Sequence, residues 1–246
     1  MRKHRLAIAG VTLMALSLTA TACGTRSDEG GSGGSGGEST KTATIGVISP
    51  LTGDLAAMGI GIKNSVDLAV KQANENNTRP GWTLKVRGED DEAKADTGRN
   101  AATNLTSDDS VVGVVGPLNS NVGQTVQPVL NSAKIAEVSP ANTGVSLTKG
   151  GDADHPKRVY DNYFRTCTTD DIQGPFAARY MYQTAGIKKV GTIHDKKAYG
   201  QGLVTAFTAE FKKLGGEVVS AQTINPDDSN FGPVISKVKS AGPRGV

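Results

Sequence analysis

Four short stretches of polar and turn-forming residues follow predicted strands and precede predicted helices. They are Ser49 with Pro50, residues 117–120, residues 139–143 and residues 194–199. In open parallel sheets the carboxyl ends of the strands meet helix N-termini at one edge, where small ligands and anions bind. Three of the four stretches carry hydroxyls and backbone turns suited to a small anion, and they carry no charged catalytic cluster. These residues therefore predict noncovalent binding of a small molecule.

Covalent chemistry has weaker support in the sequence. Cys167 is a candidate nucleophile, but no histidine and acid stand at suggestive positions around it, which favours a packed or half-buried thiol. His194 beside Asp195 suggests a catalytic pair without a nucleophile, so we interpret both as residues that order a loop. The chain has no G-x-S-x-G elbow and no Cys/His spacing typical of a metal site. We expect a protein that is not an enzyme and uses no cofactor or metal.

The elements that position these stretches alternate regularly along the chain. Apolar, β-branched runs alternate with segments of helical periodicity, which favours parallel βαβ units with a sheet covered on both faces. We predict an α/β protein of two Rossmann-like lobes, residues 41–164 and 165–246. The expected strands are 42–50, 82–90, 111–118, 135–140, 163–166, 188–195 and 217–224, and the expected helices are 58–76, 96–109, 120–134, 171–186, 199–216 and 230–242.

The first forty residues predict export. Arg2, Lys3 and Arg5 precede an apolar run over residues 7–22, the layout of a secretory signal peptide. The run ends in small residues before Cys23, which resembles a bacterial lipobox, and implies diacylation of the Cys23 thiol; the alternative is an ordinary signal with an incidental cysteine. Residues 30–37 are only Gly and Ser, typical of a flexible linker. We therefore predict a signal peptide (1–22), then a lipidated linker (23–40) that anchors the protein to the outer face of the membrane.

The charge balance excludes one large class of partner. The chain has 27 Lys and Arg against 24 Asp and Glu, and three of the basic residues lie in the predicted signal. The remainder is formally neutral and has no basic patch with interleaved aromatic residues. We expect no binding to nucleic acid.

Several motifs near the polar stretches resemble one family. "GVVGPLNSNVGQTVQPVL", "VSPANTGVSLT", "FRTCTTDDIQGPFAARY" and "HDKKAYGQGL" are similar to segments of the solute-binding proteins of branched-chain amino-acid ABC transporters. The resemblance runs from about Lys41 to the last residue. It implies a two-lobed, hinged periplasmic-binding-protein fold. It also implies capture of a branched-chain amino acid, or a related amino acid or amide, and delivery to membrane permease subunits.

The resemblance also implies roles for individual residues. Ser120 and Thr143 match the positions that bind the ligand carboxylate, and Ala141 matches the one whose carbonyl binds the ammonium. Tyr199 matches an aromatic residue that packs over the ligand. Met58 stands where some relatives have Tyr, and with Leu118 it suggests an apolar patch for the ligand side chain. The alternatives for these residues are plain ones: helix capping, turn formation and packing between lobes.

Two other functions stay open. The fold also serves ligand sensors, and a secreted hydrolase would need an activated nucleophile. Relatives of this kind continue well beyond the last predicted helix and carry the acidic partner of the ligand ammonium there. The resemblance therefore implies that the second lobe is incomplete at Val246. From that we expect weaker ligand binding than in a longer form.

Overall fold

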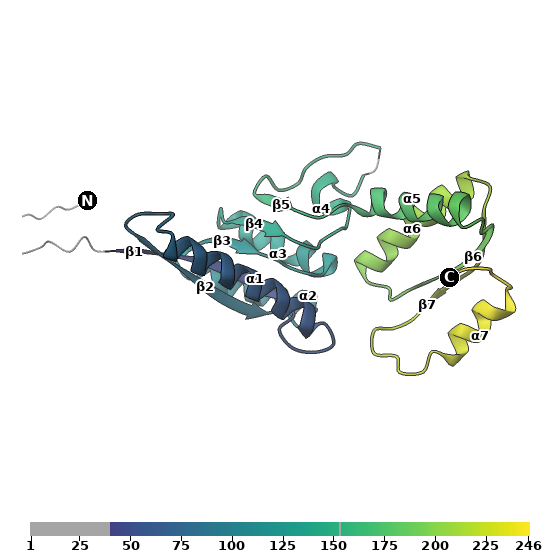
Figure 1. Cartoon of the computed structure of the whole chain (residues 1–246), viewed down its shortest axis with the longest axis horizontal. Helices are drawn as coiled ribbons and strands as arrows, with labels where there is room; N and C mark the ends of the chain where they lie inside the picture. The colour runs from purple at the N-terminus through teal and green to yellow at the C-terminus, as the bar shows by residue number, and fades with distance from the viewer. Residues whose placement is uncertain (1–39, 153) are drawn as a thin grey trace, which may run out of the picture. The chain divides into compact units, whose positions relative to one another are not determined.

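The structure is a computed structural model that describes residues 40–246 except residue 153. The predicted signal peptide, Cys23 and the Gly/Ser linker segment lie outside the described residues. Within the described part, α-helices and parallel strands alternate along the chain (Figure 1). The α/β class with parallel sheets is therefore confirmed.

Five parallel strands form the first sheet in the order β2-β1-β3-β4-β5. The register pairs Val47 of β1 with Val115 of β3, Val115 with Val138 of β4, and Val138 with Phe164 of β5. The carboxyl ends of these strands consequently lie at one edge. The elements of this region are β1 (Lys41–Ser49), α1 (Ala56–Glu75), β2 (Trp82–Asp90), α2 (Ala95–Thr106), β3 (Val111–Val115), α3 (Ser120–Ser132), β4 (Ala136–Ser139), α4 (Ser146–Lys149) and β5 (Tyr163–Arg165).

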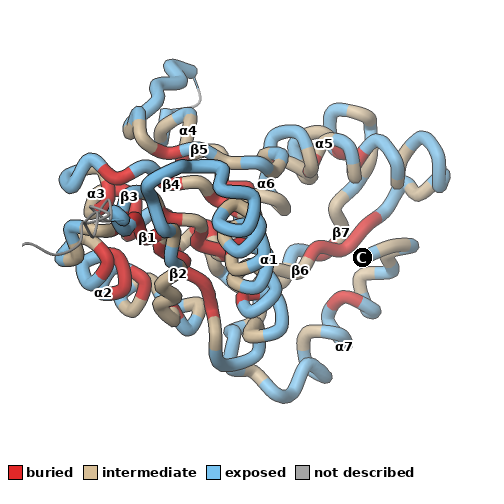
Figure 2. The backbone as a smooth tube through the Cα atoms, turned by 60° about the vertical axis from the view of Figure 1, so that its left-hand side comes forward, coloured by how far each residue is buried: buried red, intermediate tan, exposed pale blue. Residues whose placement is uncertain are grey.

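The core of this region lies between the sheet and two helices. Helices α2 and α3 pack against each other and bury Leu105 and Leu130 against Ile48 and Val114 of the strands. Helix α1 packs along β1 and β2. Figure 2 shows buried residues concentrated along the strands and on α2. Burial of these β-branched and leucine side chains is the main contribution to the stability of the region.

A second, two-stranded parallel sheet pairs β6 with β7. Its small core packs Phe211 against Ala178 and Val190, with Phe207 stacked on Phe211 at 5.3 Å between ring centroids. The elements are α5 (Asp170–Arg179), the π-helical segment η1 (Tyr180–Thr184), β6 (Lys189–His194), α6 (Ala198–Lys213), β7 (Glu217–Thr223) and α7 (Gly232–Ser240).

Three details differ from the sequence expectations. Helix α2 begins at Ala95, one residue earlier than the expected helix over 96–109, and Lys94 occupies its cap position. The helix expected over 171–186 turns π-helical from Tyr180. The strand expected at the start of the second lobe is β5, which pairs with β4 of the first sheet up to Arg165. The lobe boundary predicted between residues 164 and 165 thus falls inside this strand.

In the part of the chain that the structure describes, no helix is both long enough and apolar enough to cross a membrane.

Candidate functional site

A pocket of about 280 Å³ lies at the carboxyl edge of the first sheet. Two of its walls come from the segments that follow β3 and β4, and others from the start of α1 and the start of α6. The six residues predicted to bind ligand line it together with two that the sequence did not single out, Leu55 and Asn119. The six are Met58, Leu118, Ser120, Ala141, Thr143 and Tyr199. A cavity of this size is at the lower end for ligand pockets, so it has room for one small molecule.

Ser120 is the first helical residue of α3, and its neighbour Asn119 occupies the cap position. The Ser120 side chain is buried, and its Oγ accepts a hydrogen bond from the Gly144 N–H at 3.1 Å. That bond uses an oxygen lone pair, so the hydroxyl proton remains available for donation to a ligand. The free N–H groups at the start of α3 add partial positive charge at the same place. The position therefore favours an anion.

Asn142 and Ser139 join the two turns that carry the pocket residues. The Asn142 Nδ2 donates to the carbonyl oxygens of Pro117 at 3.0 Å and Leu118 at 2.9 Å. The Ser139 Oγ donates to Pro117 O at 2.8 Å and accepts the Asn142 N–H at 2.9 Å. Both side chains are fully buried. These bonds hold the turn after β3 and the turn after β4 in a fixed relation, so the pocket is ordered before a ligand arrives.

Arg165, the last residue of β5, supports the same turn. Its Nη1 donates to Asn142 O at 2.6 Å and to Gly144 O at 3.0 Å, and its Nη2 donates to Thr148 Oγ1 at 2.6 Å. The guanidinium thus places a positive charge directly behind the segment that carries Ala141 and Thr143. This charge adds to the attraction that the turn exerts on an anion.

Asp170 begins α5 and lies next to Thr143. The Asp170 N–H donates to Thr143 O at 3.0 Å. The Asp170 carboxyl is 1 % exposed, and among the described residues neither of its oxygens has a hydrogen-bond partner; the same holds for Thr143 Oγ1. Burial raises the pKa of Asp170 above its usual range. The Thr143 hydroxyl lies beside the Asp170 carboxyl, and of these two residues only Thr143 lines the pocket, so Thr143 is the one that a polar ligand can contact.

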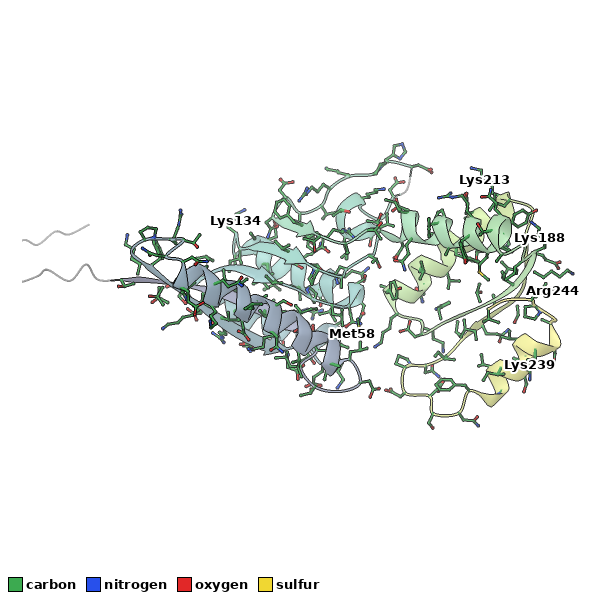
Figure 3. All side chains as sticks on the ribbon, in the orientation of Figure 1. Met58, Lys134, Lys188, Lys213, Lys239 and Arg244 are labelled. Atoms are coloured by element: carbon green, nitrogen blue, oxygen red, sulfur yellow. The ribbon has the colours of Figure 1, made fainter. Side chains whose placement is uncertain are left out.

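The other residues that line the pocket are mostly apolar or aromatic. Figure 3 labels Met58 on the first turn of α1, and its side chain is 57 % exposed. Tyr199 lies near the start of α6, where its hydroxyl accepts a hydrogen bond from Gln173 Nε2 at 3.3 Å. With Leu55 and Leu118, these side chains suit an apolar group. The site thus combines an anion-binding side with an apolar side.

The residues considered for covalent chemistry order the backbone. His194 Nδ1 accepts the Lys196 N–H at 3.0 Å, and Asp195 Oδ1 accepts the Lys197 N–H at 3.0 Å. Both therefore order the loop after β6, as the sequence indicated. Cys167 donates its Sγ–H to Asn142 O at 3.3 Å, and burial raises the pKa of its thiol. Within residues 40–246, apart from 153, no group of three or more His, Cys, Asp or Glu side chains is placed to hold a metal ion.

The fold agrees with what comparison to known proteins finds. The family described as periplasmic binding protein matches residues 42–246. The chain belongs to this family, whose members are solute-binding proteins.

Individual relatives make the resemblance more specific. The chain is 36 % identical over 199 residues to Leu/Ile/Val-binding protein homolog 3 of Brucella melitensis biotype 1, covering 81 % of this chain and 52 % of that protein. It is 35 % identical over 197 residues to Leu/Ile/Val-binding protein BraC3 of Rhizobium johnstonii, covering 80 % of this chain and 51 % of the relative. The chain therefore spans about half the length of the curated relatives it matches.

Two solved structures show the same fold. One is the branched-chain amino-acid transporter substrate-binding protein LivJ of Streptococcus pneumoniae in complex with isoleucine, with a TM-score of 0.72, 28 % identity, and coverage of 81 % of this chain and 54 % of that one. The other is a solute-binding protein of R. palustris in complex with 4-hydroxybenzoate, with a TM-score of 0.72, 25 % identity, and coverage of 82 % and 52 %. Both of those ligands carry a carboxylate.

Proposed function

We propose that this chain is the extracytoplasmic solute-binding component of an ABC importer. In this proposal it captures a branched-chain amino acid, or a related amino acid or amide, and delivers it to membrane permease subunits. The observation that carries the proposal is that one pocket is lined both by Ser120 at the start of α3 and by the apolar side chains of Leu55, Met58 and Leu118. Membership of the periplasmic binding protein family implies the extracytoplasmic location.

Each end of the ligand has a proposed partner. The carboxylate accepts hydrogen bonds from the Ser120 and Thr143 hydroxyls and from N–H groups at the start of α3. The Ala141 carbonyl accepts a hydrogen bond from the ammonium. The aliphatic side chain packs against the apolar wall, with Tyr199 over it. Burial of one branched aliphatic side chain contributes about 1.5–3 kcal/mol.

Isothermal titration tests this function. The chain is titrated with L-leucine, L-isoleucine, L-valine, L-glutamine and 4-hydroxybenzoate. We expect the branched amino acids to bind more tightly than the other two. A preference for 4-hydroxybenzoate would assign the chain to the aromatic-acid binders, and turnover of an ester or amide would assign it to the hydrolases.

The carboxylate contact has a test of its own. Ser120→Ala removes a hydrogen bond to a charged group, which is worth about 1.5–3 kcal/mol, or roughly ten- to a hundredfold in affinity. The loss should be the same for every amino acid because all share the carboxylate. Ser132→Ala, at the exposed end of the same helix, is the matched control and should leave affinity unchanged. A loss that varies with the ligand side chain would place Ser120 elsewhere in the site.

Anchoring is a separate part of the proposal. Labelled palmitate fed to producing bacteria should label the wild type and Cys167→Ser, but not Cys23→Ser. Equal labelling of Cys23→Ser and the wild type would contradict lipidation at Cys23.

A further inference from the structure

A second, larger cavity lies beside the ligand pocket. This groove has a volume of about 520 Å³, and its lining is charged where that of the pocket is apolar. The charged residues on its surface are Asp54, Glu92, Lys94, Lys197 and Asp227. The function proposed above assigns no role to the groove.

One residue belongs to the linings of both cavities. Among the described residues, Leu55 is the one that lines both the pocket and the groove. Residues around the start of α3 also show that the cavities are neighbours, because Asn119, at the cap position, lines the pocket and Asn121, two positions later, lines the groove. Leu55 therefore stands where a ligand longer than the pocket would have to pass.

The backbone at Leu55 is held in place. Its carbonyl accepts the N–H groups of Met58 at 3.0 Å and Gly59 at 3.1 Å, so the residue is tied into the first turn of α1. That turn lies tightly against the preceding loop, since a Cβ at Gly59 would stand 1.9 Å from Pro50 O. Because the backbone at Leu55 is fixed, the length of the Leu55 side chain decides whether the pocket is closed toward the groove.

The charges of the groove determine which kind of longer ligand could bind in it. Lys94 is paired with Glu92, with 2.7 Å between Nζ and Oε2. Lys94 also interacts with Asp227. Over the whole groove, three acidic residues, Asp54, Glu92 and Asp227, stand against two basic ones, Lys94 and Lys197. The groove is thus more favourable to a cationic group than to an anionic one.

We propose that Leu55 is a specificity-determining residue that limits the length of the ligand. Its side chain confines the bound molecule to the apolar pocket and excludes amino acids whose side chains end in a cationic group, such as arginine. When it is shortened, the pocket opens into the groove and the distal end of arginine reaches the Asp54 and Asp227 side. This inference rests on the function proposed above.

The test compares L-leucine and L-arginine by isothermal titration. In the wild type, arginine should bind at least a hundredfold more weakly than leucine. Leu55→Ala should bind arginine at least tenfold more tightly than the wild type does, and leucine about threefold to tenfold more weakly. Leu51→Ala is the matched control, because Leu51 belongs to the same loop and lines neither cavity. It should change neither affinity.

Two further variants sharpen the outcome. Asp227→Asn combined with Leu55→Ala should lose most of the arginine gain. Leu55→Val keeps most of the side chain, should fold even if Leu55→Ala does not, and should give a smaller gain. Folded Leu55 variants that bind leucine but gain no arginine affinity would overturn this inference and leave the proposed function standing. A wild type that binds no amino acid would overturn the proposed function, and this inference with it.

Discussion

The two sheets of this chain are built from the same βαβ units but differ in how much they bury. In the described residues, the main buried cluster of the first sheet and its helices holds ten apolar side chains, whereas that of the second holds three, Ala178, Val190 and Phe211. The buried polar side chains that order the pocket, Asn142 and Ser139, belong to the first region. The comparison indicates that the polar side chains of the candidate site are held in place by the larger of the two cores.

The first prediction concerns a tightly packed glycine of the first region. Gly116 has a φ of +122°, and a Cβ there would stand 1.9 Å from Ile48 O. Gly116→Ala should destabilise the first region by more than about 4 kcal/mol, because the backbone has to move. Urea denaturation followed by circular dichroism measures this. Gly61→Ala, in helix α1 with open space around it, should instead stabilise by up to about 1 kcal/mol. Similar results for the two variants would contradict the packing described here.

The second prediction concerns the core of the second region, which one truncation should unfold without unfolding the first region. Phe211→Ala removes the centre of the smaller core, and such truncations cost about 3–5 kcal/mol. Because the region has few other buried side chains, limited proteolysis should then cut after residue 165 while the first region stays resistant. Phe231→Ala, at an exposed position, is the control. Equal loss of protection in both regions would show that their cores unfold as one unit.

The third prediction uses pH to distinguish the regions. Glu137 of β4 is fully buried, and burial raises its pKa to about 9 from an ordinary value of 4.5. Below pH 4.5 the carboxyl is protonated in both states. Between pH 4.5 and 9 only the unfolded state loses the proton, so stability falls as pH rises, by about 3 kcal/mol at pH 7.

Glu137→Gln should remove this dependence and raise the stability of the first region at pH 7. Denaturation curves between pH 5 and 9 measure it, with the exposed Glu75→Gln as control. The stability of the second region should show no such response to Glu137→Gln. The difference in stability between the wild type and Glu137→Gln isolates the effect of Glu137. If this difference showed the wild type gaining stability as pH rises, the prediction would be contradicted.

The fourth and smallest prediction concerns an ion pair within the second region. Arg179 on α5 contacts Glu210 on α6, with 2.7 Å between Nη1 and Oε1. The arginine side chain is 46 % exposed, so solvent screens the pair and Arg179→Ala should cost no more than about 1 kcal/mol. A thermal melt at low and at high salt measures the change. A loss comparable to that of Phe211→Ala would mean that this ion pair, rather than the core, holds the two helices together.

Much of the fold was predictable because local pattern and tertiary environment agree here. The β-branched runs became β1, β3 and β6, and the hydroxyl-bearing turns lie at the carboxyl edge where parallel strands place them. The six pocket residues stand together because four segments end at that edge. Their role in binding stays a prediction.

What could not be predicted depends on contacts between distant residues. Asn142 reads as an ordinary turn residue until its amide is seen to donate to Pro117 and Leu118, more than twenty residues earlier. Arg165 and Asp170 read as charged residues near a lobe boundary, yet both support the segment that carries Thr143. No sequence pattern distinguishes Leu55 from other apolar residues, because its position on the lining of both cavities is seen only in the structure.

The position of Arg165 has a consequence for the environment in which the pocket works. Its guanidinium is partly enclosed and donates to Asn142 O, Gly144 O and Thr148 Oγ1. Dissolved salt screens an enclosed charge less than a charge on the surface. The attraction of this turn for an incoming anion should therefore vary little with ionic strength. Under the proposed function, the affinity for a carboxylate ligand should therefore stay nearly constant between a dilute and a saline medium.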